Sequence, residues 1–252
     1  MLAVSSGKGG VGKSTVSANL AVAMAAEGRR VGLMDSDIYG PNIPGMLGVS
    51  ERAGVVPGTQ RIRPAEAGGV RVISMGLLVD AGVPVIWRGP MLAKMVTQFL
   101  FWVEWGELDV LLLDLPPGTG DVQLTLTQTA PLTGAVIVTT PSTLALEDVA
   151  RGVQMFRQTE VPILGLLENM STFECPSCGG ASHPYGHGGG AAAAAKGGIP
   201  FLGEVPLDPR LRTDADEGTP TVASHPDSPA AQALRGIARD LLGRLGQPSG
   251  QS

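Results

Sequence analysis

The first residues with an evident chemistry form a glycine-rich loop near the start of the 252-residue chain. Gly7-Lys8-Gly9-Gly10-Val11-Gly12-Lys13-Ser14-Thr15 fits the phosphate-binding pattern G-x-x-x-x-G-K-[ST]. Glycines allow backbone N–H groups to turn inward and surround phosphate oxygens at a helix N-terminus. We therefore expect Lys13 to reach the β- and γ-phosphates of a nucleotide and the Ser14 hydroxyl to bind Mg²⁺. A chance glycine-rich turn is disfavoured, because the full pattern stands between a predicted strand and a predicted helix.

Three carboxylates follow apolar runs that read as strands. Asp35 and Asp37 follow one run, and Asp114 ends another, where the magnesium-positioning carboxylate of P-loop enzymes belongs. A single aspartate at the end of a strand is more often a turn former or a helix cap. Three of them in a chain with this loop favour convergence near a bound metal ion.

Two cysteines, Cys175 and Cys178, are the only ones in the chain, and their C-x-x-C spacing places both on one tight turn. Two thiolates fill half of a tetrahedral or cluster site, and a two-fold dimer would supply the other two. A bridging [4Fe–4S] cluster and a zinc ion both fit that arrangement. Spacing favours a metal or cluster over a redox dithiol or a pair without a role. A Cys₂His₂ site with His183 and His187 is disfavoured, because loop histidines are more often solvent-exposed.

Bulk composition narrows the class of protein. Hydrophobic residues make up 43% and charged residues 16%, which is typical of a globular domain. A net charge of −5 argues against a chain-wide basic surface, so we expect no nucleic-acid partner. No secretory signal or apolar run long enough to cross a bilayer is visible, so we expect a cytoplasmic protein without a membrane partner.

The elements that must position these groups alternate along the chain. Apolar runs predict strands at residues 2–5, 30–34, 70–75, 109–113, 135–139, 163–167 and 201–205. Helices are predicted at residues 16–27, 91–105, 144–158 and 229–245, with Phe99, Trp102 and Val103 of the second one buried. This alternation predicts an α/β fold, a mostly parallel β-sheet with helices on both faces. We expect one domain over residues 1–246, with a mobile insertion and short helix at 173–198 and a disordered tail at 247–252.

A second lysine inside the phosphate loop narrows the family. The sequence GKGGVGKST closely resembles the deviant Walker A form of the MinD/ParA/nitrogenase-iron-protein branch of P-loop ATPases, the SIMIBI class. The resemblance implies that Lys8 crosses a dimer interface to the partner's nucleotide. A cation delivered in this way would stabilise charge on the transferring phosphoryl group and link hydrolysis to dimerisation. We therefore expect a homodimer.

Motifs along the whole chain are similar to the Mrp/ApbC family of iron–sulfur cluster carrier ATPases. They are SSGKGGVGKST, MDSDIYGPNIP, WRGPM at 87–91, DLPPGTGD at 114–121, ENMS followed by CPSC, and FLGEVPLDP at 201–209. The resemblance implies an ATP-dependent carrier that holds a labile [4Fe–4S] cluster between two subunits and passes it to apo-proteins. Many bacterial members carry a small extra domain before the loop, which we expect to be absent or trimmed here.

The same resemblance implies a role for individual residues. Lys8, Lys13 and Asp37 would be catalytic, with Asp37 orienting the attacking water. Ser14 would bind Mg²⁺, Asp35 and Asp114 would support that ion through its waters, and Thr15 would lie near the α-phosphate. Asn169 would read the adenine edge, Pro206 and Asp208 would border the base, and Cys175 and Cys178 would ligate the cluster. Two other functions stay open: a MinD/ParA-like positioning ATPase, and an ATPase with a structural Cys₄ zinc site. A metabolic phosphotransferase is disfavoured, because no substrate-binding motif is apparent.

Overall fold

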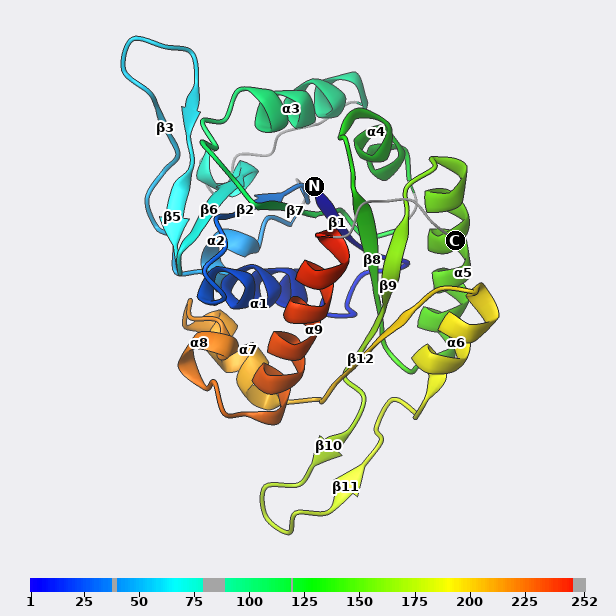
Figure 1. Ribbon diagram of the computed structural model, residues 1–252. Helices are drawn as coiled ribbons and strands as arrows, with labels where there is room; N and C mark the ends of the chain where they lie inside the picture. The colour runs from blue at the N-terminus through cyan, green and yellow to red at the C-terminus, as the bar shows by residue number, and fades with distance from the viewer. Residues whose placement is uncertain (38–39, 79–88, 119, 247–252) are drawn as a thin grey trace.

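The computed structural model describes residues 1–37, 40–78, 89–118 and 120–246 (Figure 1). The predicted tail at 247–252 and parts of the motifs at 34–44, 87–91 and 114–121 lie outside these ranges. Within the described residues, no helix combines the length and apolar character needed to cross a membrane.

An eight-stranded sheet forms the centre of the molecule, with strand order β12-β9-β8-β1-β7-β2-β6-β5. Its strands are β1 (Leu2–Ser6), β2 (Val31–Asp35), β5 (Ala65–Ala67), β6 (Val70–Ser74), β7 (Val110–Asp114), β8 (Gly134–Thr139), β9 (Ile163–Asn169) and β12 (Phe201–Val205). All neighbours pair in parallel except β5, which runs antiparallel to β6 at one edge. The predicted α/β fold with a mostly parallel sheet is confirmed.

Two helical layers cover the sheet because both of its faces are apolar. Successive strand residues point to opposite faces, so Leu2 and Val4 belong to one core and Ala3 to the other. One layer contains α1 (Lys13–Ala26), α2 (Ile43–Met46), α7 (Pro209–Asp216), α8 (Thr221–Ser224) and α9 (Pro229–Leu245). The other contains α3 (Gly89–Phe101), α4 (Asp121–Thr129), α5 (Thr143–Gln158) and α6 (Gly189–Gly197). Figure 1 shows α1 and α9 side by side on their layer.

The α3 segment differs from its prediction. The helix ends at Phe101 rather than continuing to residue 105, so Trp102 is no longer on its buried face and is 43% exposed. The prediction that Trp102 is buried was therefore wrong, whereas Phe99 and Val103 are buried as expected. Trp105 is buried instead, and its indole Nε1 donates to the Phe99 carbonyl oxygen at 2.9 Å.

The segment at 173–198 consists of two different parts. A short hairpin, β10 (Phe173–Glu174) and β11 (Ala181–Ser182), projects from the body of the protein in Figure 1. Helix α6 follows it and packs against α5, β9 and β12, with Ala194 buried. A second hairpin, β3 (Gly54–Val55) and β4 (Ile62–Arg63), and the 3₁₀ turn η1 (Met75–Leu77) had no predicted counterpart.

Candidate functional site

The phosphate loop connects β1 to α1 at the carboxyl edge of the parallel strands, where ligands bind in open α/β sheets. Gly10 and Gly12 have φ values of 84° and 82°, in the left-handed region that favours glycine. A Cβ atom at Gly12 would lie 2.3 Å from the Asn169 side-chain nitrogen. The loop therefore needs glycine at this position both for its backbone conformation and for the close approach of β9.

Lys13, Ser14 and Asp114 meet at the end of β7. The Lys13 ammonium lies 2.8 Å from Asp114 Oδ2, and the Ser14 hydroxyl donates to the same oxygen at 2.7 Å. Asp114 is fully buried, and Lys13 is 6% exposed. Ser17 donates to the other carboxylate oxygen, Oδ1, at 2.6 Å. The predicted phosphate lysine and magnesium ligands thus converge on one buried carboxylate.

Asp35 lies beside Asp114, because β2 and β7 pair in register at these two residues. It accepts hydrogen bonds from the Asp37 backbone N–H at 3.1 Å and the Ser74 hydroxyl at 3.0 Å. Burial and the nearby charge of Asp114 raise the pKa of Asp35 to about 7, although these hydrogen bonds and Lys13 oppose the shift. Asp35 is therefore a carboxyl group whose charge responds to a cation placed next to it.

Two other predicted catalytic residues lie at the rim of this site. Asp37 is half-buried, and its carboxylate accepts a hydrogen bond from the Gly40 N–H at 3.2 Å. Lys8 is half-buried, and its ammonium group makes no hydrogen bond or ion pair with any residue that the structure describes.

The donor set fits a magnesium nucleotide. Mg²⁺ prefers hard oxygen ligands, and the Ser14 hydroxyl and the carboxylates of Asp35 and Asp114 supply them at one end of the sheet. Lys13, the first residue of α1, supplies the positive charge for phosphate oxygens at the N-terminus of that helix. The chain therefore carries the groups that a triphosphate and its metal ion require.

Asn169 lies at the end of β9, against the phosphate loop. Its side-chain amide donates to the Val11 carbonyl oxygen at 2.9 Å, and its Oδ1 atom is buried without a hydrogen-bond partner among the described residues. A buried, unpaired acceptor is costly unless a donor reaches it. An exocyclic amine such as that of adenine would satisfy it, which agrees with the predicted role without testing it.

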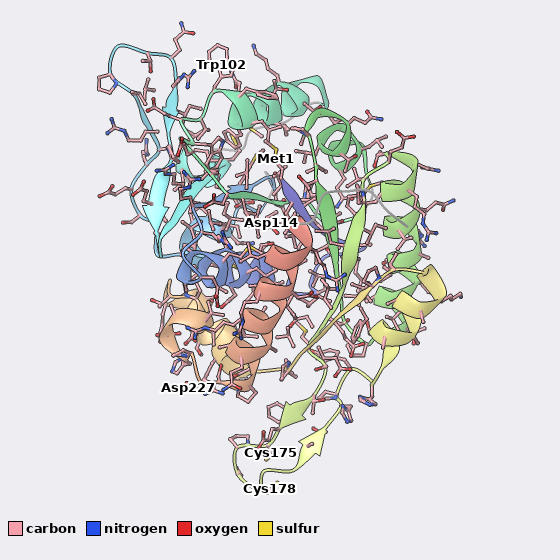
Figure 2. The ribbon with its side chains drawn as sticks, in the orientation of Figure 1. Met1, Trp102, Asp114, Cys175, Cys178 and Asp227 are labelled. Atoms are coloured by element: carbon pink, nitrogen blue, oxygen red, sulfur yellow. The ribbon has the colours of Figure 1, made fainter. Side chains whose placement is uncertain are left out.

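Cys175 and Cys178 lie at the far end of the β10–β11 hairpin, as Figure 2 shows. The turn is closed by Cys175 N–H donating to the Gly180 carbonyl at 3.0 Å and Gly179 N–H donating to the Cys175 carbonyl at 2.8 Å. Backbone N–H groups of Ser177 and Cys178 point at the Cys175 sulfur and lower the pKa of this thiol, with a smaller contribution from the Cys178 side chain. A turn that stabilises a thiolate in this way is suited to bind a metal.

Within one chain the described residues hold no group of three or more His, Cys, Asp or Glu side chains able to bind a metal ion. His183 and His187 instead pair with each other, with ring centroids 4.4 Å apart, and His183 lies 3.3 Å from the Thr172 hydroxyl. The Cys₂His₂ alternative therefore has no support in this geometry.

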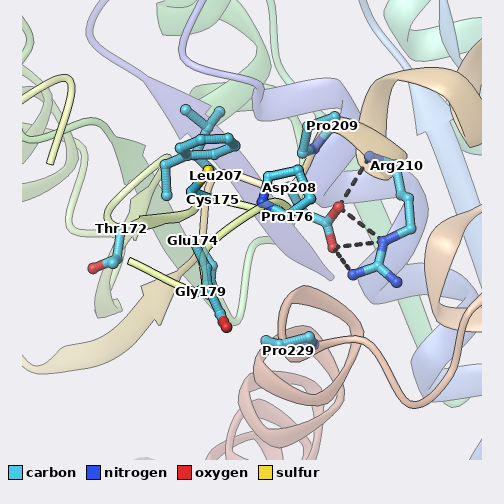
Figure 3. A pocket seen from close by; sticks show the side chains of 12 residues that line it. Thr172, Glu174, Cys175, Pro176, Gly179, Leu207, Asp208, Pro209, Arg210 and Pro229 are labelled. Atoms are coloured by element: carbon cyan, nitrogen blue, oxygen red, sulfur yellow. Dashed lines mark hydrogen bonds and ion pairs between the residues drawn. The ribbon is translucent and has the colours of Figure 1, made fainter. Parts of the chain in front are cut away.

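The hairpin also borders a hollow of about 680 Å³ (Figure 3). Cys175 and Pro176 line it on the hairpin side, and Pro206 and Leu207 line it on the side of the body. Asp208 caps α7 by accepting from the Arg210 N–H at 3.0 Å, and it also pairs with the Arg210 guanidinium. The residues predicted to border the base thus lie next to the residues predicted to hold the cluster.

Known proteins identify the family. Residues 1–242 match the profile of the NUBPL iron-transfer P-loop NTPases, within the ParA group. The chain belongs to this family. It is 53% identical over 242 residues to the iron-sulfur cluster carrier protein of Deinococcus radiodurans, a match that covers 96% of this chain and 69% of that protein. It is 46% identical over 248 residues to the iron-sulfur cluster transfer protein NUBPL of Dictyostelium discoideum, covering 97% and 76% of the two chains.

Solved structures of related proteins have the same fold. A nucleotide-binding protein from Archaeoglobus fulgidus, solved with ADP, has a TM-score of 0.76 and 42% identity over 86% of this family member and 85% of that chain. The septum site-determining protein MinD of Pyrococcus horikoshii, solved with Mg-ADP, has a TM-score of 0.74 and 25% identity over 97% and 96% of the two chains. The predicted resemblance to cluster carriers and to the MinD branch is confirmed, and the chain is a P-loop NTPase.

Sequence reasoning missed several polar residues at this site. Ser17 stands three positions after Ser14, on the same face of α1, and this spacing was an available signal for a second hydroxyl near Asp114. Ser74 ends β6 beside Asp35. Glu168 is fully buried next to Asn169, and no short-range pattern marks it.

Proposed function

We propose that this chain is an ATP-dependent iron–sulfur cluster carrier, which binds a [4Fe–4S] cluster across a homodimer and transfers it to apo-proteins. The observation that carries the proposal is the C-x-x-C turn, whose backbone N–H groups favour the Cys175 thiolate, in a chain with a complete phosphate loop. Relatives that are named as cluster carriers or transfer proteins support it.

The chain's own residues would bind and orient the nucleotide. Lys13 would exchange its partner Asp114 for phosphate oxygens, and Ser14 would bind the metal ion that Asp35 and Asp114 support through its waters. A bound Mg²⁺ would neutralise charge on the phosphates. Asp37 would orient the attacking water, and Asn169 with the turn at Pro206 and Asp208 would hold the base. We infer slow ATP hydrolysis, coupled to cluster binding or transfer.

A second subunit would complete both half-sites. Each copy offers two thiolates, and [4Fe–4S] clusters are held by four. Each copy also offers a Lys8 ammonium without a partner in its own described chain. Delivered across the interface, this lysine would stabilise the transferring phosphoryl group of the other subunit. The 114–121 segment would sense the γ-phosphate and so change the spacing of the two cysteine turns. We place this activity in the cytoplasm, without a nucleic-acid or membrane partner.

Anaerobic reconstitution with iron and sulfide tests the cluster. We expect broad visible absorbance and about four iron atoms per dimer. Cys175→Ala and Cys178→Ala should each lose both signals and keep nucleotide binding, whereas Ser177→Ala, in the same turn, should retain the cluster. Zinc in place of iron in anaerobically purified protein would favour the structural Cys₄ alternative. ATP-dependent sedimentation with liposomes would favour a positioning ATPase.

A further inference from the structure

The cysteine hairpin is joined to the body of the protein through two arms, and both arms lie next to the end of strand β9. Its outgoing arm leaves β9 after Asn169, where Ser171 N–H donates to the Val205 carbonyl at 3.1 Å. Its returning arm enters α6, where the Gly190 N–H donates to the Glu168 carboxylate. Two consecutive residues of β9 therefore make different contacts: Asn169 contacts the phosphate loop, and Glu168 contacts the returning arm.

Glu168 has an environment that a surface carboxylate does not have. Its side chain is fully buried, and Oε1 has no hydrogen-bond partner among the described residues. Oε2 accepts from Gly190, in the first turn of α6, where backbone N–H groups have no partner within the helix. A carboxylate at this end of a helix is also favoured by the helix dipole. Burial of an incompletely paired acid is costly, so the Gly190 hydrogen bond is the interaction that compensates part of this cost.

The returning arm approaches β9 closely at Gly190. A Cβ atom at Gly190 would lie 2.7 Å from Glu168 Oε2 and 2.9 Å from Glu168 Cβ. A Cβ atom at Gly189 would lie 2.5 Å from a methyl carbon of Leu146 in α5. The run Gly188-Gly189-Gly190 thus permits a direct contact between Glu168 and the backbone of α6.

We propose that Glu168 is a positioning residue for the cysteine hairpin, which holds the N-terminus of α6 and the returning arm at a fixed place relative to the phosphate loop. Asn169, its neighbour, binds Val11 within that loop. A displacement of the loop on nucleotide binding would therefore reach the end of β9, which continues into the outgoing arm and contacts the returning arm through Glu168. Cys175 lies six residues beyond Asn169 along the chain. This inference rests on the proposed carrier function and names the part of the chain through which the nucleotide would act on the cluster.

Glu204, a charged residue next to Glu168, offers a control substitution. Glu204 is its register partner on β12, and His187 stands just before α6. Burial raises the pKa of Glu168 and the charge of Glu204 adds to this, whereas the Gly190 hydrogen bond and His187 oppose it. Glu204→Gln removes this neighbouring charge without touching the contact to α6.

The test compares Glu168→Ala, Glu168→Gln and Gly190→Ala with Glu204→Gln and the wild-type dimer, all reconstituted anaerobically. We expect nucleotide affinity, measured with a fluorescent ATP analogue, to change by less than about twofold in every variant. Glu168→Ala and Gly190→Ala should shorten the lifetime of the bound cluster about tenfold, the lower end of the loss in metal affinity when a group that orients a metal ligand is removed. In both variants, cluster transfer should proceed at the same rate with and without ATP. The visible circular dichroism of the cluster should also change.

Glu168→Gln keeps the shape of the side chain and one acceptor for Gly190, so it should restore much of the lifetime that alanine loses. Gly190→Ala leaves every buried polar group in place, and it decides the question if Glu168→Ala does not fold. Equal lifetimes and equal ATP ratios in Gly190→Ala and wild type would overturn the positioning role. A wild-type dimer and a Glu204→Gln dimer that load no cluster would instead overturn the proposed function.

Discussion

The Lys13 ammonium lies 2.8 Å from Asp114 Oδ2, and this ion pair joins the first turn of α1 to the end of β7. Both side chains are buried. Removing one partner of a buried pair leaves the other charge uncompensated, which is more costly than removing both. The pair therefore links the stability of the nucleotide-free protein to the residues that would handle phosphate.

Asp114→Asn should lower the free energy of unfolding by about 3 kcal/mol, because Lys13 keeps its charge in a buried place. The double variant Lys13→Met/Asp114→Asn should recover part of that loss. Denaturant unfolding of wild type, the two single variants and the double variant measures the interaction energy between the two side chains. Mg-ATP should stabilise Asp114→Asn if phosphate oxygens replace the lost partner. Additive effects of the two substitutions would show that the ion pair contributes nothing.

Asp35→Asn should change how stability depends on pH. The folded-state pKa of about 7 lies above the ordinary value of 3.8, so the folded protein retains this proton while the unfolded chain loses it. Stability contributed by this site therefore falls as the pH rises from about 4 to about 7 and is constant above that range. Relative to wild type, Asp35→Asn should gain about 4 kcal/mol across this window in metal-free buffer.

Ser74→Ala tests the same pKa of Asp35 from a neighbouring residue. Its hydroxyl donates to Asp35 Oδ2, and this hydrogen bond lowers the pKa of Asp35. Removing it should move the upper end of the window to higher pH. If the free energies of unfolding of wild type and Asp35→Asn differ by the same amount at every pH between about 4 and 8, the pKa of Asp35 is not raised.

Gly12→Ala should abolish nucleotide binding, since the new methyl group meets Asn169 in a backbone conformation that alanine disfavours. Gly28→Ala is the matched control, because Gly28 has a φ of 78° and a Cβ atom added there would meet nothing within 4 Å. Both variants should lose about 1 kcal/mol from the left-handed backbone alone. Calorimetric titration with ADP separates them: only Gly28→Ala should bind with wild-type affinity.

The Cys175 thiol should react at lower pH than an ordinary cysteine. Backbone N–H groups of Ser177 and Cys178 stabilise its thiolate and lower its pKa. In a Cys178→Ser variant, the rate of alkylation by iodoacetamide should therefore rise with pH at a lower midpoint than in the same protein unfolded in urea. Coincident midpoints would show that the folded turn does not stabilise the thiolate.

Lys8→Ala should leave folding unchanged, because the ammonium has no partner among the described residues of its own chain. We expect ATP hydrolysis to fall about 1,000-fold, the range found when a cation supplied to the transition state is removed. Mixing Lys8→Ala with Lys13→Ala subunits tests delivery in trans. Random pairing should restore about a quarter of wild-type activity, since half of the dimers are mixed and each holds one intact site. Additive residual rates in the mixture would exclude trans action.

Much of the candidate nucleotide site could be predicted from the amino-acid sequence. The phosphate loop is a contiguous run whose glycines and lysines act through local backbone geometry. Strand-end aspartates were predictable for a related reason, because parallel strands bring their carboxyl ends to one edge, and Asp35 and Asp114 do lie in register there. The strands at 201–205 and the helix at 229–245 begin and end where the apolar patterns begin and end.

Contacts between distant segments could not be predicted in this way. Whether Trp102 or Trp105 is buried depends on where α3 ends against its neighbours. The donation from Asn169 to Val11 and the contact between Glu168 and Gly190 join residues that no sequence period relates. The amino-acid sequence by itself identified the candidate phosphate and thiolate groups, because they stand in contiguous runs that form local loops and turns. Only the tertiary structure decided that the end of β9 contacts both the phosphate loop and the start of α6, because packing across the sheet sets those distances.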